Sequence, residues 1–272
     1  MRTSRFIKHS TIAAGIVSLL GLGNANSARA AVLNGGFESG FSGYTTIGDT
    51  IVHTGSFKSK YGNGKSQAVI SNTPGAEVDF TFSGKPSVSA SALEHFLGLN
   101  SGSLDAIATN SAVEGSAIKQ TFFGNVNDTI SFDFSFLTDE DTWSQQDHNK
   151  PNPNYNDFSF LTLQFEDSPA YVFALADTYS DFTYSYTTPF IYETGFQTKS
   201  LSLAASGNYT LGFGVVDVGD ESFASSLLVD NIKLTSSQNK PVPVPSSVVA
   251  LAMFGFSAFG TYIKRGQHKL KA

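Results

Sequence analysis

Two segments of the chain alternate large apolar residues with small or polar ones over seven positions each. They are Ile130, Phe132, Phe134 and Phe136, which alternate with Ser131, Asp133 and Ser135, and Tyr209, Leu211, Phe213 and Val215, which alternate with Thr210, Gly212 and Gly214. A period of two puts one face of a β-strand against a core and leaves the other face polar. Because each apolar face must be buried against another layer, the chain is expected to form packed β-sheets.

Further strands are expected between turn signals such as Asn127-Asp128 and Ser206-Gly207-Asn208. The segments concerned are Val78 to Phe82, Phe158 to Phe165, Tyr171 to Leu175, Leu201 to Leu203 and Ser226 to Leu234. Many short strands with one half-buried face predict an all-β fold, an antiparallel β-sandwich of the jelly-roll type.

One segment departs from this pattern. Ser91 with Glu94 three residues later fits a helical capping box, and Gly98 can end the helix. The sequence therefore predicts one short helix, from Ser91 to Leu97, covering one end of the sandwich.

The first 30 residues have the organisation of a secretory signal peptide. Basic residues at Arg2, Arg5 and Lys8 precede an apolar stretch from Ile12 to Leu22, and Ala28-Arg29-Ala30 supplies the small residues that a signal peptidase accepts. The alternative is a retained membrane helix, which the short apolar run disfavours. Cleavage is expected after Ala30, so the chain is predicted to be exported.

The other end of the chain is predicted to be a linker followed by a membrane anchor. Prolines make residues 238–247 an extended spacer. From Val248 to Ile263 no residue is charged, and these about 16 residues would span roughly 24 Å as a helix. A basic cluster follows, and by the positive-inside rule it stays cytoplasmic. Segment 248–272 is therefore expected to hold the domain outside the membrane.

The tail between Val242 and Lys271 resembles the C-terminal sorting signal of PEP-CTERM proteins, with a proline motif, a short hydrophobic helix and a basic end. The resemblance implies an exported protein that an exosortase-type enzyme processes. The motif of that family is Val-Pro-Glu-Pro, whereas Pro243, Val244 and Pro245 put valine where glutamate is expected. The tail is then either kept as a permanent anchor or processed, which would release the protein to the cell surface or extracellular matrix.

Residues 31–237 are expected to form one domain, because no low-complexity linker interrupts them and they suffice for a core without cysteines. Of the 17 Lys and Arg, four lie in the first 30 residues and four in the tail, whereas all 23 Asp and Glu lie between. With 9 basic and 23 acidic residues, the span 31–240, which includes Lys240 of the linker, carries a net charge of −14. This charge disfavours nucleic acid and anionic lipid, and it favours cations or neutral ligands.

The domain carries resemblances of its own. Asn34-Gly-Gly-Phe-Glu38 and Leu228-Val-Asp-Asn-Ile232 look like the first and last strands of carbohydrate-binding modules with a galactose-binding-like jelly roll. That resemblance implies a structural calcium ion held by Glu38 and Asp230. Oxygen ligands suit calcium, although both carboxylates could equally bind turn backbone. Three blocks, beginning at Ser91, Glu114 and Leu211, resemble a set of exported PEP-CTERM β-sandwich proteins. This resemblance does not point to any particular activity.

Aromatic residues beside polar ones are candidates for stacking on sugar rings. Tyr184 and Tyr186 alternate with Ser185 and Thr187, although these rings could also belong to the core of one sheet. Trp143, the only tryptophan, opens a long polar loop that ends at Tyr155. Trp143 with Tyr155 is the preferred ligand-contact pair, because loops of that length are often functional.

Two groups of acidic residues remain, and they are Asp217, Asp220 and Glu221 on an expected loop, and Asp139, Glu140 and Asp141. On a strand Asp139 and Asp141 would face one way, as a carboxylate pair for glycoside hydrolysis would require. No partner motif marks an acid and a nucleophile, so hydrolysis is only an alternative. The sequence predicts a non-enzymatic surface or matrix protein that associates with extracellular polysaccharide, and a purely structural coat protein is the other alternative.

Overall fold

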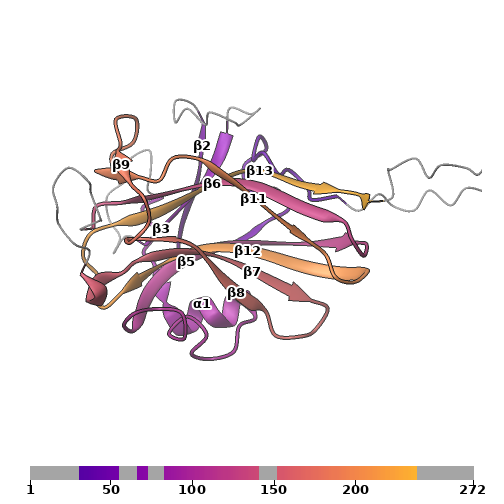
Figure 1. The fold of residues 1–272 in the computed structure, drawn as a ribbon, viewed down its shortest axis with the longest axis horizontal. Helices are drawn as coiled ribbons and strands as arrows, with labels where there is room; N and C mark the ends of the chain where they lie inside the picture. Colours follow the sequence, from indigo (N-terminus) through magenta and orange to yellow (C-terminus); the bar gives the residue numbers. More distant parts are fainter. Residues whose placement is uncertain (1–30, 55–65, 73–82, 141–151, 238–272) are drawn as a thin grey trace, which may run out of the picture.

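The computed structural model describes residues 31–54, 66–72, 83–140 and 152–237. These residues form two β-sheets stacked face to face, with one α-helix on the outside (Figure 1). The predicted all-β antiparallel sandwich with one short helix is therefore confirmed.

Sheet 1 has the strand order β1-β5-β12-β7-β8, with β4 also paired to β5. Its strands are β1 (Thr45–Ile47), β4 (Val88–Ser89), β5 (Ala112–Gly124), β7 (Phe158–Phe165), β8 (Tyr171–Asp177) and β12 (Gly207–Val218). Sheet 2 has the order β2-β3-β13-β6-β10-β9, with β11 also paired to β6. Its strands are β2 (Asp49–Thr54), β3 (Ser66–Ser71), β6 (Thr129–Thr138), β9 (Thr183–Tyr184), β10 (Tyr192–Glu193), β11 (Gln197–Ser202) and β13 (Ser225–Thr235).

Several long strands that follow one another in the chain belong to different sheets. β5, β6 and β7 alternate between sheet 1 and sheet 2, and so do β11, β12 and β13. The described pairings are all antiparallel. The chain thus winds back and forth between two layers, as it does in jelly-roll sandwiches.

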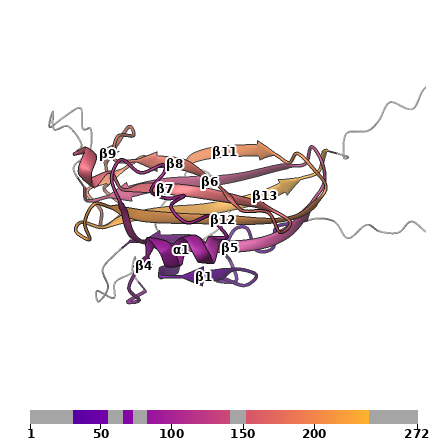
Figure 2. The same cartoon turned by 90° about the horizontal axis from the view of Figure 1, so that it is seen from below.

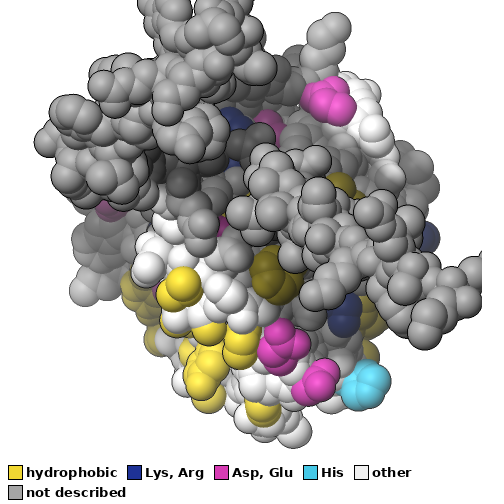
Figure 3. Space-filling view, turned by 90° about the vertical axis from the view of Figure 1, so that its right-hand side faces the viewer, with side chains coloured by type: hydrophobic (Ala, Val, Ile, Leu, Met, Phe, Trp, Pro, Cys, Tyr) yellow, Lys and Arg dark blue, Asp and Glu magenta, His cyan; other side chains and the backbone are white. Residues whose placement is uncertain are grey.

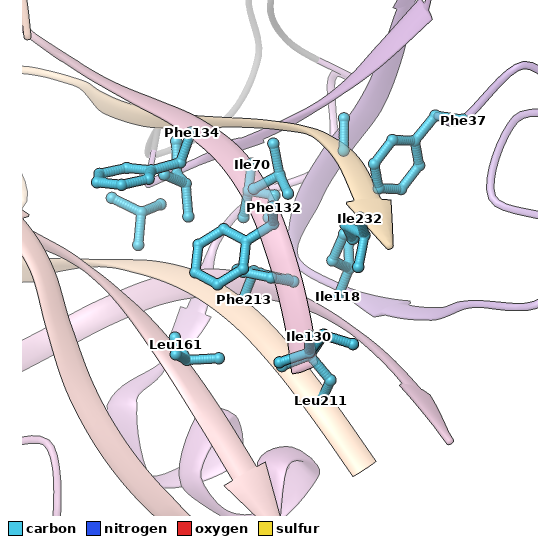
Figure 4. Close-up of a cluster of buried hydrophobic side chains, with 14 of the residues drawn as sticks. Phe37, Ile70, Ile118, Ile130, Phe132, Phe134, Leu161, Leu211, Phe213 and Ile232 are labelled. Carbon is cyan, nitrogen blue, oxygen red and sulfur yellow. The ribbon is translucent and has the colours of Figure 1, made fainter. Parts of the chain in front are cut away.

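The main core lies between the sheets and is built from the two alternating segments. Phe132 of β6 and Phe213 of β12 meet edge to face with their ring centroids 4.8 Å apart, and both are buried (Figure 4). Other inward residues of these strands join the same cluster, and they are Ile130, Phe134, Phe136, Tyr209, Leu211 and Val215. Burial of these large apolar side chains is the main term that stabilises the sandwich.

Helix α1 (Ala90–Leu97) packs on the outer face of sheet 1 and not over an end of the sandwich (Figure 2). Its buried residues Leu93 and Leu97 contact the outer side of β5, β7 and β12, where Ala117, Phe160 and Val216 lie. The prediction of a short helix is confirmed, but its expected place is wrong. The outward face of sheet 1 is apolar at these positions, and α1 shields these side chains from water.

The start of α1 also differs from the prediction. Ser89 is the N-cap and accepts a hydrogen bond from Ala92 N at 3.4 Å, whereas Ser91 was expected to cap. Glu94 forms no capping box, because its carboxylate accepts the N–H groups of Gly102 (3.0 Å) and Leu104 (2.9 Å) in the loop that follows. Its longer-range bonds hold that loop against the helix.

The two ends of the sandwich are called proximal and distal below. At the proximal end, Ser237 N donates a 3.0 Å hydrogen bond to Asp128 Oδ1 in the turn between β5 and β6. The first described residues lie near the same end, where Leu33 N donates a 2.8 Å hydrogen bond to Gln120 Oε1 of β5. The distal end comprises the ends of β6 and β12 and the starts of β7 and β13, on the left in Figure 1. A chain continuing from Ser237 therefore leaves opposite the distal end.

Several predicted segments lie outside the described residues. They are the signal peptide 1–30, the strand from Val78 to Phe82, the linker 238–247, and the anchor 248–272, together with the sorting motif Pro243, Val244 and Pro245. Within the described ranges, no helix is both long enough and apolar enough to cross a membrane.

Candidate functional site

The segment from Asn34 to Glu38 forms turns and not the first strand that its resemblance implied, since β1 starts only at Thr45. The turn docks on a bulge of β13, where Ile232 N donates to Gly35 O at 2.9 Å. A β-carbon at Gly35 would lie 2.0 Å from the carbonyl oxygen of Ile232, so the close approach requires glycine.

This docking brings the predicted calcium residues into one neighbourhood, called the Glu38 cluster and made of Glu38, Asp133 and Asp230. Asp133 pairs with Asp230 across β6 and β13, on the outer face of sheet 2. Burial raises the pKa of Asp230 to about 6, the hydrogen bond from Asn231 N opposes the shift, and the charges of Asp133 and Glu38 add to it. Sequence reasoning missed Asp133, which faces Asp230 only once the strand register is known.

The Glu38 cluster offers only oxygen donors, which suits a hard cation such as calcium. Its side chains are also engaged with protein groups. Glu38 accepts from Ser66 N (3.2 Å) and Ser66 Oγ (3.3 Å), and Asp133 accepts from Asn231 Nδ2 (2.9 Å). Within the described part of the chain, no three His, Asp or Glu side chains are placed to hold a metal ion as they stand. The donor chemistry fits calcium, whereas a complete ligand set is not formed.

A second acidic group lies inside the sandwich at its distal end and is called the Asp217 cluster, made of Glu114, Glu140, Asp157 and Asp217. Asp217 continues the inward row of β12 two residues after Val215, between the sheets. It is only 1% exposed, and neither carboxylate oxygen has a hydrogen-bond partner among the described residues. The sequence placed Asp217 on a loop with Asp220 and Glu221, but only the other two follow the strand.

Asp157, just before β7, is buried beside Asp217 and is well provided with donors. Asn72 Nδ2 (2.8 Å) and Ser225 Oγ (2.7 Å) donate to its Oδ2, and Val218 N (3.0 Å) donates to its Oδ1. Burial raises the pKa of Asp157 in spite of these bonds. Its carboxyl group faces that of Asp217, and two carboxyl groups can bond to each other only when they share a proton.

Electrostatics link the whole Asp217 cluster. Burial raises the pKa of Asp217, and the charges of Asp157, Asp220, Glu114 and Glu140 raise it further. Burial also raises the pKa of Glu114 to about 7, with a smaller contribution from Glu221. The sequence did contain a signal for Asp217. The alternation along β12 places every second residue on the inner face, and Asp217 is two residues after the inward Val215.

The alternative catalytic pair is only partly described. Asp139 follows β6, and its Oδ1 accepts the N–H of Ile191 at 2.7 Å. Burial raises the pKa of Asp139 above its ordinary value, and the hydrogen bond from Ile191 only partly opposes this shift. Asp141 lies outside the described residues, so the predicted pair is not seen together.

The predicted ligand-binding tyrosines occupy different environments at the distal end. Tyr186 is 89% exposed, and Tyr155, at the end of the 3₁₀ helix η1 (Pro153–Tyr155), is 36% exposed. Tyr184 is half-buried and stacks on Tyr192, with ring centroids 5.4 Å apart. Trp143 lies outside the described residues. The alternative prediction, that these rings belong to the core of one sheet, is therefore not met by Tyr184, which is only half-buried, or by Tyr186, which is almost fully exposed.

Two further exposed rings lie at the distal end. Tyr179 (46% exposed) follows β8, and Phe223 (66%) precedes β13. Backbone bonds join the segments that carry the rings: Thr178 N donates to Asp157 O (3.2 Å), and Asp139 N donates to Ala224 O (3.0 Å). Four loops therefore present aromatic rings at one end of the molecule.

A separate pair of rings lies on the edge strand β8, where Tyr171 is 72% and Phe173 51% exposed. They point to the same side because they are two residues apart. Figure 3, which looks onto the proximal end, shows hydrophobic side chains exposed beside acidic ones there as well. Exposed rings at β8 and at the distal end form two distinct surfaces.

No protein-family model matches the chain, and no curated protein matches its sequence. Solved structures with a related arrangement include a family 61 carbohydrate-binding module in complex with β-1,4-galactotriose, at 10% identity over 77% of this chain and 100% of that one, with a TM-score of 0.42. The K1 cleaved adhesin domain of Lys-gingipain from Porphyromonas gingivalis W83 aligns at 10% identity over 76% and 97%, with a TM-score of 0.37.

The CBM22-1-GH10 modules of Clostridium thermocellum xylanase 10B, complexed with xylohexaose, align at 14% identity, with a TM-score of 0.32. That alignment covers 77% of this chain and 29% of the other. At these identities and TM-scores the likeness carries no conclusion about this chain, and the sugars named belong to those proteins.

Proposed function

We propose that the protein is an exported, non-enzymatic surface or matrix protein that binds extracellular polysaccharide through the aromatic rings of its distal end. The observation that carries the proposal is the gathering of Tyr155, Tyr179, Tyr186 and Phe223 on four loops that hydrogen bonds join. Scattered single exposed apolar residues need no explanation, whereas a group of rings at one end is typical of a binding surface.

The chemistry of these loops suits a neutral or weakly charged sugar chain. Flat rings offer faces for pyranose stacking, and the polar residues beside them offer hydrogen bonds to hydroxyl groups. Ser185, Thr188 and Asp181 lie in the same loops. The net charge of −14 in residues 31–240 disfavours nucleic acid and strongly anionic polymers.

The position of Ser237 supports an outward-facing role for this end. The chain leaves the sandwich at the proximal end, so the expected linker and anchor in 238–272 would direct the distal end away from the membrane. Processing of the tail by an exosortase-type enzyme would release the same surface into the extracellular matrix.

The Glu38 cluster enters the proposal as a structural calcium site. A cation there would hold the turn at Glu38 against Asp230 of β13 and offset the repulsion between their carboxylates. It would stiffen the fold at a distance from the rings, and it would take no part in contact with sugar.

The test is a glycan-array screen of the full chain, in calcium and in chelator, followed by affinity measurements on the best glycan. Tyr155→Ala with Tyr186→Ala should weaken binding at least tenfold, which is about 1.4 kcal/mol. The matched control removes two exposed rings elsewhere, by Tyr171→Ala with Phe173→Ala, and should leave the affinity unchanged.

Three results would contradict the proposal. A folded chain that binds no glycan would favour a structural coat protein. Loss of affinity only in the Tyr171 and Phe173 control would move the binding surface to β8. Release of sugar that stops with Asp139→Asn would make the protein a glycoside hydrolase.

A further inference from the structure

The Asp217 cluster contains a carboxylate to which no donor among the described residues forms a hydrogen bond. Asp217 is 1% exposed and lies between the two sheets, yet neither of its oxygens has a hydrogen-bond partner in the described part of the chain. Burial of an ionised carboxylate without a partner is among the most costly arrangements in a protein interior. Such a group persists when it is protonated or when it binds a cation.

The charges around Asp217 make the arrangement more costly still. Asp157, Asp220, Glu114 and Glu140 all act on it with the same sign. No arginine lies in the described ranges. Three of the four described lysines interact elsewhere: Lys119 donates to the Phe96 carbonyl, Lys199 lies over the Phe134 ring, and Lys233 acts on Asp230. The fourth, Lys85, is exposed.

The surroundings of Asp157 favour a cation over a shared proton. Three donors, from Asn72, Ser225 and Val218, point at its carboxyl group. Hydrogen bonds of this kind favour the ionised form of a carboxyl group. These donors hold the Asp157 carboxyl group in place facing a second buried carboxyl group, and a positive ion between the two would offset the cost of burying both.

We propose that the Asp217 cluster binds a divalent cation of the calcium or magnesium class between the two sheets, with Asp157 and Asp217 as its first ligands. The cluster offers carboxyl oxygens and neither thiol nor imidazole, which is the donor set of a hard cation. As they stand, no three of these described carboxyl groups are placed to hold an ion. Glu114 and Glu140, whose charges act on Asp217, would complete the ligand set by turning toward the ion.

This site is distinct from the Glu38 cluster. Asp133 and Asp230 lie on the outer face of sheet 2, in the row of Leu137 and Leu228, whereas Asp217 lies on the inner face of sheet 1, in the row of Val215. The inference does not rest on glycan binding, and the two sites can be tested separately by substitution.

The test uses the full chain, stripped with chelator and dialysed, followed by elemental analysis and thermal unfolding during calcium titration, with magnesium as competitor. At calcium 100-fold above its Kd, wild-type Tm should rise by about 5 °C or more. Asp217→Asn should remove this rise and one bound ion per chain. Asp167→Asn, an exposed turn residue, is the control that should keep both.

Glu114→Gln serves where Asp217→Asn does not fold, and it should weaken calcium binding by about tenfold in isothermal titration. Two outcomes would overturn the proposal. One is a wild-type Tm that ignores both cations while Asp217→Asn is as stable as wild type, which would assign a shared proton. The other is a calcium response that persists in Asp217→Asn and disappears only in Glu38→Gln with Asp230→Asn.

Discussion

The side-chain amide of Asn72 donates a 2.8 Å hydrogen bond to Asp157 Oδ2, from the end of a strand of sheet 2 to the start of a strand of sheet 1. Asn72 Oδ1 also accepts the N–H of Ser225 at 2.6 Å. Since Ser225 Oγ donates to the same carboxylate oxygen, the three residues close a buried triangle of hydrogen bonds. This triangle joins the two sheets where the apolar core ends.

Removal of Asn72 should therefore destabilise the distal end. Asn72→Ala leaves Ser225 N without its acceptor and Asp157 with one donor fewer, and each lost partner of a buried group costs about 1–3 kcal/mol. Urea unfolding should show a free energy of unfolding lower by at least about 2 kcal/mol. The exposed Asn208→Ala is the control, and equal stability of the two variants would refute the structural role of the triangle.

Adjacent glycines in the N-terminal turn should respond differently to the same substitution. Gly35→Ala places a methyl group 2.0 Å from the Ile232 carbonyl oxygen, so the turn must leave β13. At Gly36 the nearest atom would be Asp230 Oδ1 at 3.8 Å, an ordinary contact. Thermal unfolding should show a large loss of Tm for Gly35→Ala and little change for Gly36→Ala. Equal effects would mean that the turn does not dock as described.

The sequence predicted the strands in which apolar residues face inward at every second position. β6 and β12 were found because each has four successive inward positions that are aromatic or aliphatic, from Ile130 to Phe136 and from Tyr209 to Val215. β5, at 13 residues the longest strand, was not predicted as one. Its inward row includes Ser116, whose Oγ accepts Asp49 N, and Gln120, which binds Leu33 and Gly43. Polar residues that bind other segments hide the period from a hydrophobicity pattern.

The candidate sites could be predicted only in part, for a related reason. Glu38 and Asp230 were singled out through a resemblance, and the structure brings them together by docking a turn, although a metal there stays a prediction. No neighbouring residue in the sequence marks Asp157 as a site residue. Its carboxyl group accepts hydrogen bonds from Asn72, Val218 and Ser225, which are far from it in the chain. Contacts between segments far apart in the chain depend on strand register, which composition and spacing do not specify.

Tyr44 offers a substitution that should stabilise the protein. Its ring packs against Phe37, with centroids 5.0 Å apart, but its buried hydroxyl has no hydrogen-bond partner among the described residues. Tyr44→Phe keeps the ring and removes the unsatisfied group, so the free energy of unfolding should rise by about 1 kcal/mol. Phe37→Ala, which opens a cavity in the same place, should instead cost about 3–5 kcal/mol. A loss of stability in Tyr44→Phe would reveal a partner for the hydroxyl.

The Asp217 cluster should make stability fall as pH rises when chelator removes divalent ions. Burial raises the pKa of Glu114 to about 7 from its ordinary value near 4.5, and it raises those of Asp157 and Asp217 as well. Between pH 4.5 and 7 the folded chain therefore binds protons that the unfolded chain has released. The contribution of Glu114 is complete below pH 4.5 and is lost as the pH rises through 7. Urea unfolding between pH 4.5 and 8 should show this decline, and Glu114→Gln should make it shallower. A full wild-type slope in Glu114→Gln would exclude Glu114 as a contributor, and stability that increases with pH would contradict burial of these carboxyl groups.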